Sequence, residues 1–210
     1  MDRYTFIERS LRQIYGGYIP DDSEITFLLV NNWLTDAIGL AAQKCYQGNI
    51  AIDGIGYVNN SFYTTFRSLP ITQFEQFTWR ITLPEIPVGI GRVEGVPNLK
   101  ILDADGNISL PVIPVSQNQA TVSQSMRPVQ NKTLWKPEGK YGYIYTTLIL
   151  SGYTASITMI SGGDATTLDS ELNVPPDYLP VLVEYIKQQL LVEQSRPRDL
   201  ANDGQDLPSN

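Results

Sequence analysis

The segment DADGN carries alternating oxygen donors of the kind that bind calcium. Asp103, Asp105 and Asn107 would take the first, third and fifth positions of a calcium-binding loop. The sixth position, which should be glycine, is Ile108, and the twelfth, which should be glutamate, is Pro114. The segment therefore predicts an Asp-Gly hairpin turn rather than a metal site.

The segment GIGRVEG, with Gly89 and Gly91, has part of the glycine spacing of a dinucleotide-binding loop. That loop needs a long helix after it to aim backbone amides at a pyrophosphate, whereas the strand-like VPNLKIL follows here. These glycines therefore predict a turn.

The sequence contains no histidine, which excludes Ser-His and Cys-His nucleophile pairs and histidine-ligated zinc. We expect no catalytic site, no metal and no cofactor.

The remaining reactive residue types also favour structural roles. Cys45 is the single cysteine and lies on an apolar helical pattern, which favours a small buried hydrophobe over a reactive thiol. The carboxylates Asp164, Asp169 and Glu171 lie in GGDATTLDSE, whose Gly, Ser and Thr residues favour a solvated linker. A hydrolase that uses paired carboxylates is therefore the last of the functions we weigh.

Aromatic residues are the most informative of these candidates. In YGYIY, Tyr141, Tyr143 and Tyr145 alternate and should share one face of a strand. Tyrosine is enriched at protein interfaces, so we favour a contact between subunits over a ligand site. Trp33 and Trp79 lie on apolar stripes and are expected in the core. The alternative is a sugar-binding platform formed by exposed aromatics at residues 135–145.

Composition and charge restrict the partners. The chain has 210 residues, enough for one large domain or two small ones, and a formal net charge of -7. That charge argues against a DNA-binding surface, which needs lysine and arginine to displace counterions from phosphates. The first residues, MDRYTFIERS, lack an apolar targeting region, and the longest apolar stretch is too polar for a membrane span. We expect a soluble, intracellular protein without a membrane partner.

Two amphipathic helices are expected within residues 1–48. The first has Tyr4, Ile7, Leu11 and Ile14 on one face and ends at Gly16 and Gly17. The second begins with Asp21 and Glu24 in a capping-box pattern and ends near Gly48. Its apolar positions are Ile25, Leu28, Leu29, Trp33, Ala37, Leu40, Ala41 and Cys45.

Residues 166–192 predict a linker and a last helix, entered at Pro175 and Pro176. This helix has two apolar stripes, and one stripe would suffice for a surface helix. The first stripe, expected to face the other helices, comprises Leu179, Leu182, Val183, Ile186 and Leu190. The second, expected to contact a neighbouring subunit, comprises Tyr178, Val181, Tyr185 and Val192.

Between these helices, residues 49–165 predict an antiparallel β module. In FTWRITL, Phe77, Trp79, Ile81 and Leu83 should face one way, opposite to Arg80 and its threonine neighbours. Residues 98–112 and 140–161 each predict two strands joined by a tight turn, at Asp105-Gly106 and at Ser151-Gly152. The polar segment 116–132 predicts a long loop that is an interface or is mobile.

The fold that follows is α+β: a small helical bundle, formed by the N- and C-terminal helices, with an inserted antiparallel β module. Residues 193–210 predict an extended C-terminal assembly arm, because Pro197 and Pro208 discourage helix. Within this arm, Leu200 and Leu207 could anchor in a partner's groove, and Arg196 and Arg198 could pair with acidic groups.

The segment VPPDYLPVLVEYIKQQLL and the tail SRPRDLANDGQDLPSN resemble the C-terminus of head-to-tail connector proteins of short-tailed bacteriophages, and more narrowly ring proteins of crAss-like phages. The resemblance implies a homo-oligomeric adaptor ring, a dodecamer, between the portal protein and the adjacent tail or ring proteins. It implies a location in the virion at the head-tail interface, after assembly in the host cytoplasm.

In such a ring, DNA would pass through during genome ejection without specific binding, because an acidic channel wall repels it. The sequence-based hypothesis is therefore a virion structural protein that is not an enzyme. The alternative from another class is a virion decoration protein, or a host-glycan-binding protein, built on the β module.

Overall fold

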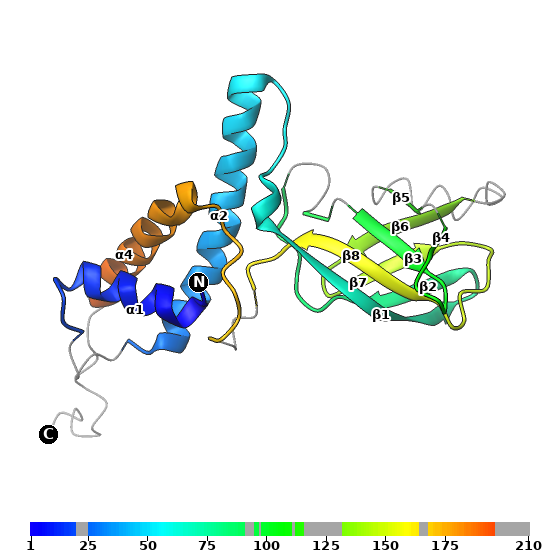
Figure 1. The fold of residues 1–210 in the computed structure, drawn as a ribbon, viewed down its shortest axis with the longest axis horizontal. Helices are drawn as coiled ribbons and strands as arrows, with labels where there is room; N and C mark the ends of the chain where they lie inside the picture. Colours follow the sequence, from blue (N-terminus) through cyan, green and yellow to red (C-terminus); the bar gives the residue numbers. More distant parts are fainter. Residues whose placement is uncertain are drawn as a thin grey trace, which may run out of the picture.

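The computed structural model describes residues 1–19, 25–90, 95–96, 98–110, 112–115, 132–163 and 168–195. Within these residues the chain forms three α-helices and eight strands, so it is a mixed α+β protein. Figure 1 shows the helices gathered at one end of the molecule and the strands at the other. All eight strands lie between the second and third of these helices in the sequence.

Helix α1 spans Arg3–Ile14, close to the prediction. The Asp2 side chain caps its start by accepting a hydrogen bond of 2.6 Å from the backbone N–H of Thr5. Gly16 and Gly17, both with positive φ, follow its end, as expected. Tyr4 is not part of the buried face: it is 45% exposed and stacks on the ring of Phe27.

Helix α2 spans Phe27–Asp53, and both predicted ends were wrong. Its N-cap is Thr26, and the expected capping box at residues 21–24 lies outside the described residues. The helix continues past Gly48 because one glycine in a helix interior costs only about 1 kcal/mol. It ends at Gly54, whose φ of 72° gives the left-handed cap. Leu28, expected in the buried face, is 50% exposed.

Helix α4 spans Leu179–Ser195 and passes the predicted boundary at residue 192. The expected helix entrance at Pro175 and Pro176 is instead a short 3-10 turn, η2, over Pro176–Tyr178. Pro176 is its first residue, where the missing N–H costs least. Leu182, Ile186 and Leu190 are buried, so the first predicted stripe packs in the core, with Leu179 and Val183 half-buried beside it.

The three helices share one hydrophobic core, to which α1, α2 and α4 all contribute. The segments entering and leaving the sheet also reach this core, through Phe62 of the short turn η1 (Asn60–Phe62) and through Ile160. The central buried residues are Phe6, Ile7, Leu11, Val30, Leu34, Ala37, Ile38, Ala41, Cys45, Leu182, Ile186 and Leu190. Cys45 is buried, as predicted.

A buried arginine joins the helices to the end of the sheet. Arg3 is 1% exposed. Its guanidinium donates to Asn31 Oδ1 at 2.6 Å, Thr35 Oγ1 at 2.7 Å and the carbonyl oxygen of Gly162 at 2.6 Å. Gly163 has a φ of 82°, and a Cβ there would collide with the Arg3 guanidinium. Arg3 therefore connects α1, α2 and the segment after the last strand.

The strands form a single sheet in the order β4-β3-β8-β1-β2-β7-β6-β5. β1 is the longest: its first half pairs with β8 and its second half with β2, with a bulge near Ser68, whose φ is 58°. The sheet curls until β5 contacts β3. The strands are β1 (Tyr63–Glu75), β2 (Thr78–Thr82), β3 (Asn98–Leu102), β4 (Ile108–Leu110), β5 (Val112–Pro114), β6 (Thr133–Glu138), β7 (Tyr141–Tyr145) and β8 (Thr154–Ile160).

The curled sheet encloses a second hydrophobic core, formed by inward side chains from both of its halves. It includes Trp79, Ile81, Leu99, Ile101, Trp135, Ile144, Ile157 and Met159. Phe77, expected on the same face as Trp79, is instead 52% exposed, because it lies in the β1–β2 turn with a φ of 65°. The strand pattern therefore begins one residue later than predicted.

One of the two predicted hairpins is confirmed. β3 and β4 pair antiparallel around the turn at Asp105 and Gly106, whose φ is 81°. The second is wrong: β7 and β8 flank the turn at Ser151-Gly152, but β2 and β1 lie between them in the sheet. Alternation shows which side chains face inward, and it does not identify the neighbouring strand. The predicted loop 116–132 lies outside the described residues, except for Lys132.

Candidate partner interface

The three tyrosines of β7 lie on the outer face of the sheet. Gly142 and Ile144 are buried between them, so Tyr141, Tyr143 and Tyr145 alternate outward, as predicted. Gly142 is paired with Ile81, and a Cβ there would lie 2.8 Å from the Ile81 side chain, so a larger residue would push the strand outward. Tyr141 is 38% exposed, and the other two tyrosines are half-buried.

An arginine and a phenylalanine from neighbouring strands complete this surface. The Arg80 guanidinium carbon of β2 lies 4.7 Å from the centre of the Tyr141 ring and 5.2 Å from that of Phe74. Phe74 of β1 packs edge-on against Tyr143, with ring centres 5.6 Å apart. We name Phe74, Arg80, Tyr141 and Tyr143 the aromatic face.

Contacts with two aromatic rings restrain the Arg80 side chain in this cluster. A cation held over two aromatic rings gains electrostatic attraction from both ring faces. Its side-chain entropy is then already lost, so less is lost on association. Aromatic residues and arginine are also the types that dominate binding energy at protein interfaces. The aromatic face therefore has the composition and rigidity of a protein-binding surface.

Charges and burial set the properties of the surface beside the aromatic face. Lys136 of β6 donates to Glu138 Oε2 at 2.8 Å, so this pair neutralises itself next to the tyrosines. Burial raises the pKa of Tyr145, so its hydroxyl stays protonated across the physiological range. The surface around β7 thus offers tyrosine hydroxyls and the guanidinium of Arg80.

The second stripe of α4 is divided between the core and the surface. Tyr178, Val181 and Tyr185 are half-buried against the helical core of the same chain. Tyr178 packs edge-on against Phe62, and its hydrogen bond with Cys45, together with burial, raises its pKa to about 12. Val192 is 52% exposed. The predicted intersubunit contact stays a prediction, with Val192 as its exposed member.

The candidate residues of the C-terminal arm, Arg196, Arg198, Leu200 and Leu207, lie outside the described residues. The arm was expected to begin at residue 193, but residues 193–195 are the last turn of α4. Any independent arm therefore begins after Ser195.

The segment DADGN forms an ordinary turn, whereas residues 91–94 of the glycine-rich segment and Asp164 lie outside the described residues. Asp103 Oδ1 accepts hydrogen bonds from the backbone N–H groups of Asp105, at 3.0 Å, and Asn107, at 2.8 Å, which is the chemistry of a turn. Among the described residues, no three acidic, cysteine or histidine side chains lie close enough together to hold a metal ion. Glu171 forms an isolated β-bridge with Asp2.

The alternative of an exposed aromatic platform at residues 135–145 loses one of its members. Trp135 is 2% exposed and belongs to the core of the sheet, so it cannot stack on a sugar ring. Trp79 is 6% exposed, as predicted for a core residue, and Trp33 packs against the helical core. The exposed aromatics near β7 are Tyr141, Phe74 and Phe77.

The sequence pattern predicts the outward direction of the β7 tyrosines, but it does not predict their contacts with Arg80 and Phe74. Arg80 alternates with buried Trp79 and Ile81, which put it on the outer face of its strand. The distances to Tyr141 and Phe74, however, depend on the β1–β2–β7 order, and no local pattern encodes that order.

Among the helices in the described part of the chain, none has the length and apolar character needed to span a membrane. No protein-family model matches the chain, and a search of curated proteins finds no match.

Proposed function

We propose that this chain is a virion structural protein that forms a homo-oligomeric adaptor ring between the portal and the tail of a bacteriophage. The aromatic face is the observation that carries this proposal. It is a rigid, outward cluster of three aromatic side chains and one arginine on three strands, of the type that binds other proteins. We assign it to contact with the portal or the adjacent ring.

The architecture supports the same function. We infer that α1, α2 and α4 form a small helical bundle and that the strands are an insertion into it. In support, α2 and α4 pack together although the whole sheet lies between them in sequence. Such a layout lets the helical part join subunits while the inserted part extends toward a neighbouring component.

The charge of the chain suits a DNA passage. With a formal net charge of -7, long-range repulsion keeps DNA from binding to the protein surface. A channel lined with this charge would let DNA slide through during ejection. The absence of histidine also suits a chain without a catalytic site, cofactor or metal.

Truncating the aromatic face should prevent attachment to the portal or adjacent ring. In the double variant Arg80→Ala and Tyr141→Ala, both truncated side chains lie on the outer face, so folding should be preserved. We expect co-purification of the variant with virus particles to fall at least about tenfold, as hot-spot truncations do. The measurement is quantitative immunoblotting of particles assembled in cells that express only the variant.

The matched control is Thr65→Ala, an exposed β1 residue whose hydroxyl bonds only across the sheet to Thr158, at 2.9 Å. It should be incorporated normally. Normal incorporation of the double variant, with circular dichroism unchanged, would contradict a role for this face in assembly. If the double variant instead assembles normally but loses binding to a glycan array, the alternative of a host-glycan-binding protein is favoured, with Tyr141 and Phe74 as its exposed rings.

A further inference from the structure

The end of α2 projects from the molecule and is apolar. Figure 1 shows this end rising above both the other helices and the sheet. Ile52 is 82% exposed and Ile55 is 67% exposed, with Ile50 and Tyr57 at 43% and 49%. We name Ile50, Ile52, Ile55 and Tyr57 the α2 tip. Exposed apolar clusters of this kind mark protein interaction sites.

The α2 tip is held in a fixed shape. The side-chain amide of Asn49 donates to the carbonyl oxygen of Tyr57 at 2.8 Å, and the Tyr57 hydroxyl donates to Asp53 Oδ2 at 3.1 Å. Gly56 lies so close to the Tyr46 ring that any Cβ there would collide with it. The turn at the end of α2 is therefore fastened back onto the helix. A preorganised tip loses little entropy on docking.

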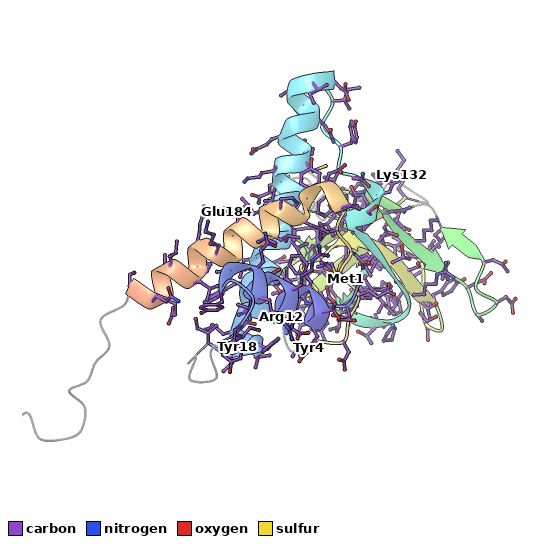
Figure 2. All side chains as sticks on the ribbon, turned by 60° about the vertical axis from the view of Figure 1, so that its left-hand side comes forward. Met1, Tyr4, Arg12, Tyr18, Lys132 and Glu184 are labelled. Atoms are coloured by element: carbon purple, nitrogen blue, oxygen red, sulfur yellow. The ribbon has the colours of Figure 1, made fainter. Side chains whose placement is uncertain are left out.

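The same chain carries a recess of about 440 Å³ between α1 and α4. That volume is within the range of about 300–1,000 Å³ that binding clefts occupy. We name it the α1–α4 groove; its apolar lining includes Phe6, Leu179, Pro180 and Val183. Arg9 and Glu184 are its charged residues. In Figure 2, Glu184 lies on α4 beside α1, well below the projecting end of α2.

We infer that the α2 tip of one subunit docks into the α1–α4 groove of the next copy of this chain. This inference rests on the proposed ring and names the surfaces that join its subunits. The tip and much of the groove lining are apolar, and Asp53, on the last turn of α2 beside the tip, is opposite in charge to Arg9, one of the two charged side chains of the groove. A second copy therefore supplies a projecting apolar end and a carboxylate that can pair with Arg9.

The arrangement dictates a head-to-tail assembly. Tip and groove are different surfaces, so each docking event leaves one free tip and one free groove. Addition then continues, and a rotation between neighbours that closes on itself brings the first and last subunits together in a ring, as the proposed function requires. A symmetric dimer would instead require one surface to pair with itself.

Reversing the two charges together tests the inference. Asp53→Arg alone and Arg9→Glu alone should each weaken self-association about tenfold, whereas mixing the two variants should restore it to within about threefold of the wild-type chain. Ile52→Asp, at a side chain that is 82% exposed, should abolish self-association without unfolding the chain. Arg12→Glu, on α1 but outside the groove, should have no effect. Sedimentation velocity of the full chain provides the readout.

Cross-linking gives an independent measurement, since Cys45 is buried and the background is otherwise free of cysteine. A copy with Ile55→Cys and a copy with Glu184→Cys should form a mixed disulfide faster than either forms with a copy carrying Arg12→Cys. Equal rates, or full self-association by Ile52→Asp, would overturn the docking inference. If either of these results is found and rings still form, the proposed function stands and only the docking surfaces are wrong. If the wild-type chain stays monomeric and the two cysteine variants form no mixed disulfide, both the docking inference and the proposed function are contradicted.

Discussion

Replacing Arg3 by methionine is expected to destabilise the protein by about 3 kcal/mol, because each buried acceptor left without its donor costs about 1–3 kcal/mol. Methionine fills similar volume but donates no hydrogen bond. The carbonyl oxygen of Gly162 and the hydroxyl of Thr35 would each lose a buried donor. The contact between α1 and the end of the sheet would weaken as a result.

Urea unfolding followed by circular dichroism measures this loss. Arg12→Met is the matched control on the same helix: its guanidinium is exposed and pairs with Glu8 at 2.7 Å, four residues earlier. Such an exposed pair contributes at most about 1 kcal/mol, so the control should unfold close to the wild-type midpoint. Equal stability of the Arg3 and Arg12 variants would show that the buried network does not hold the helices to the sheet.

Removing residues 196–210 is expected to abolish attachment to the portal or adjacent ring while leaving the thermal midpoint almost unchanged. The deletion starts after Ser195 so that α4 stays complete. The removed sequence has few apolar residues, so we expect it to add little to the stability of the isolated chain. Across a partner surface, Leu200 and Leu207 can be buried and Arg196 and Arg198 can pair with acidic groups.

Pull-down with the portal protein of the same virus, together with differential scanning calorimetry, measures both effects. A full-length double variant, Leu200→Ser and Leu207→Ser, should reproduce the loss of attachment if the leucines are the anchors. Ser209→Ala should bind normally. A large fall in the thermal midpoint would make the tail part of the core, and normal incorporation of the truncated chain into particles would make it dispensable.

Local periodicity predicted the elements better than their ends. The helices came from apolar residues three and four positions apart, such as Leu182 and Ile186 in α4. The end of α2 was wrong because Gly48 and Gly54 both suggest a stop, and only Gly54 has the left-handed conformation that ends a helix. The φ angle of a glycine cannot be read from the sequence.

Long-range arrangement was the part that local patterns do not contain. β7 and β8 are consecutive in the sequence, joined by residues 146–153, yet β2 and β1 separate them in the sheet. The burial of Arg3 had no local signal either, because its partners Asn31, Thr35 and Gly162 come from distant parts of the sequence. The outward direction of Tyr141 followed from alternation, whereas its contact with Arg80 required the pairing of three strands.

Native mass spectrometry of the purified chain, alone and with the portal protein of the same virus, tests the ring most directly. The monomer mass is 23.5 kDa, so the number of subunits follows from the mass of each complex. We expect one closed oligomer of fixed subunit number, a dodecamer by the resemblance to connector proteins, that binds the portal. A chain that stays monomeric alone and does not bind the portal would contradict the proposed adaptor ring.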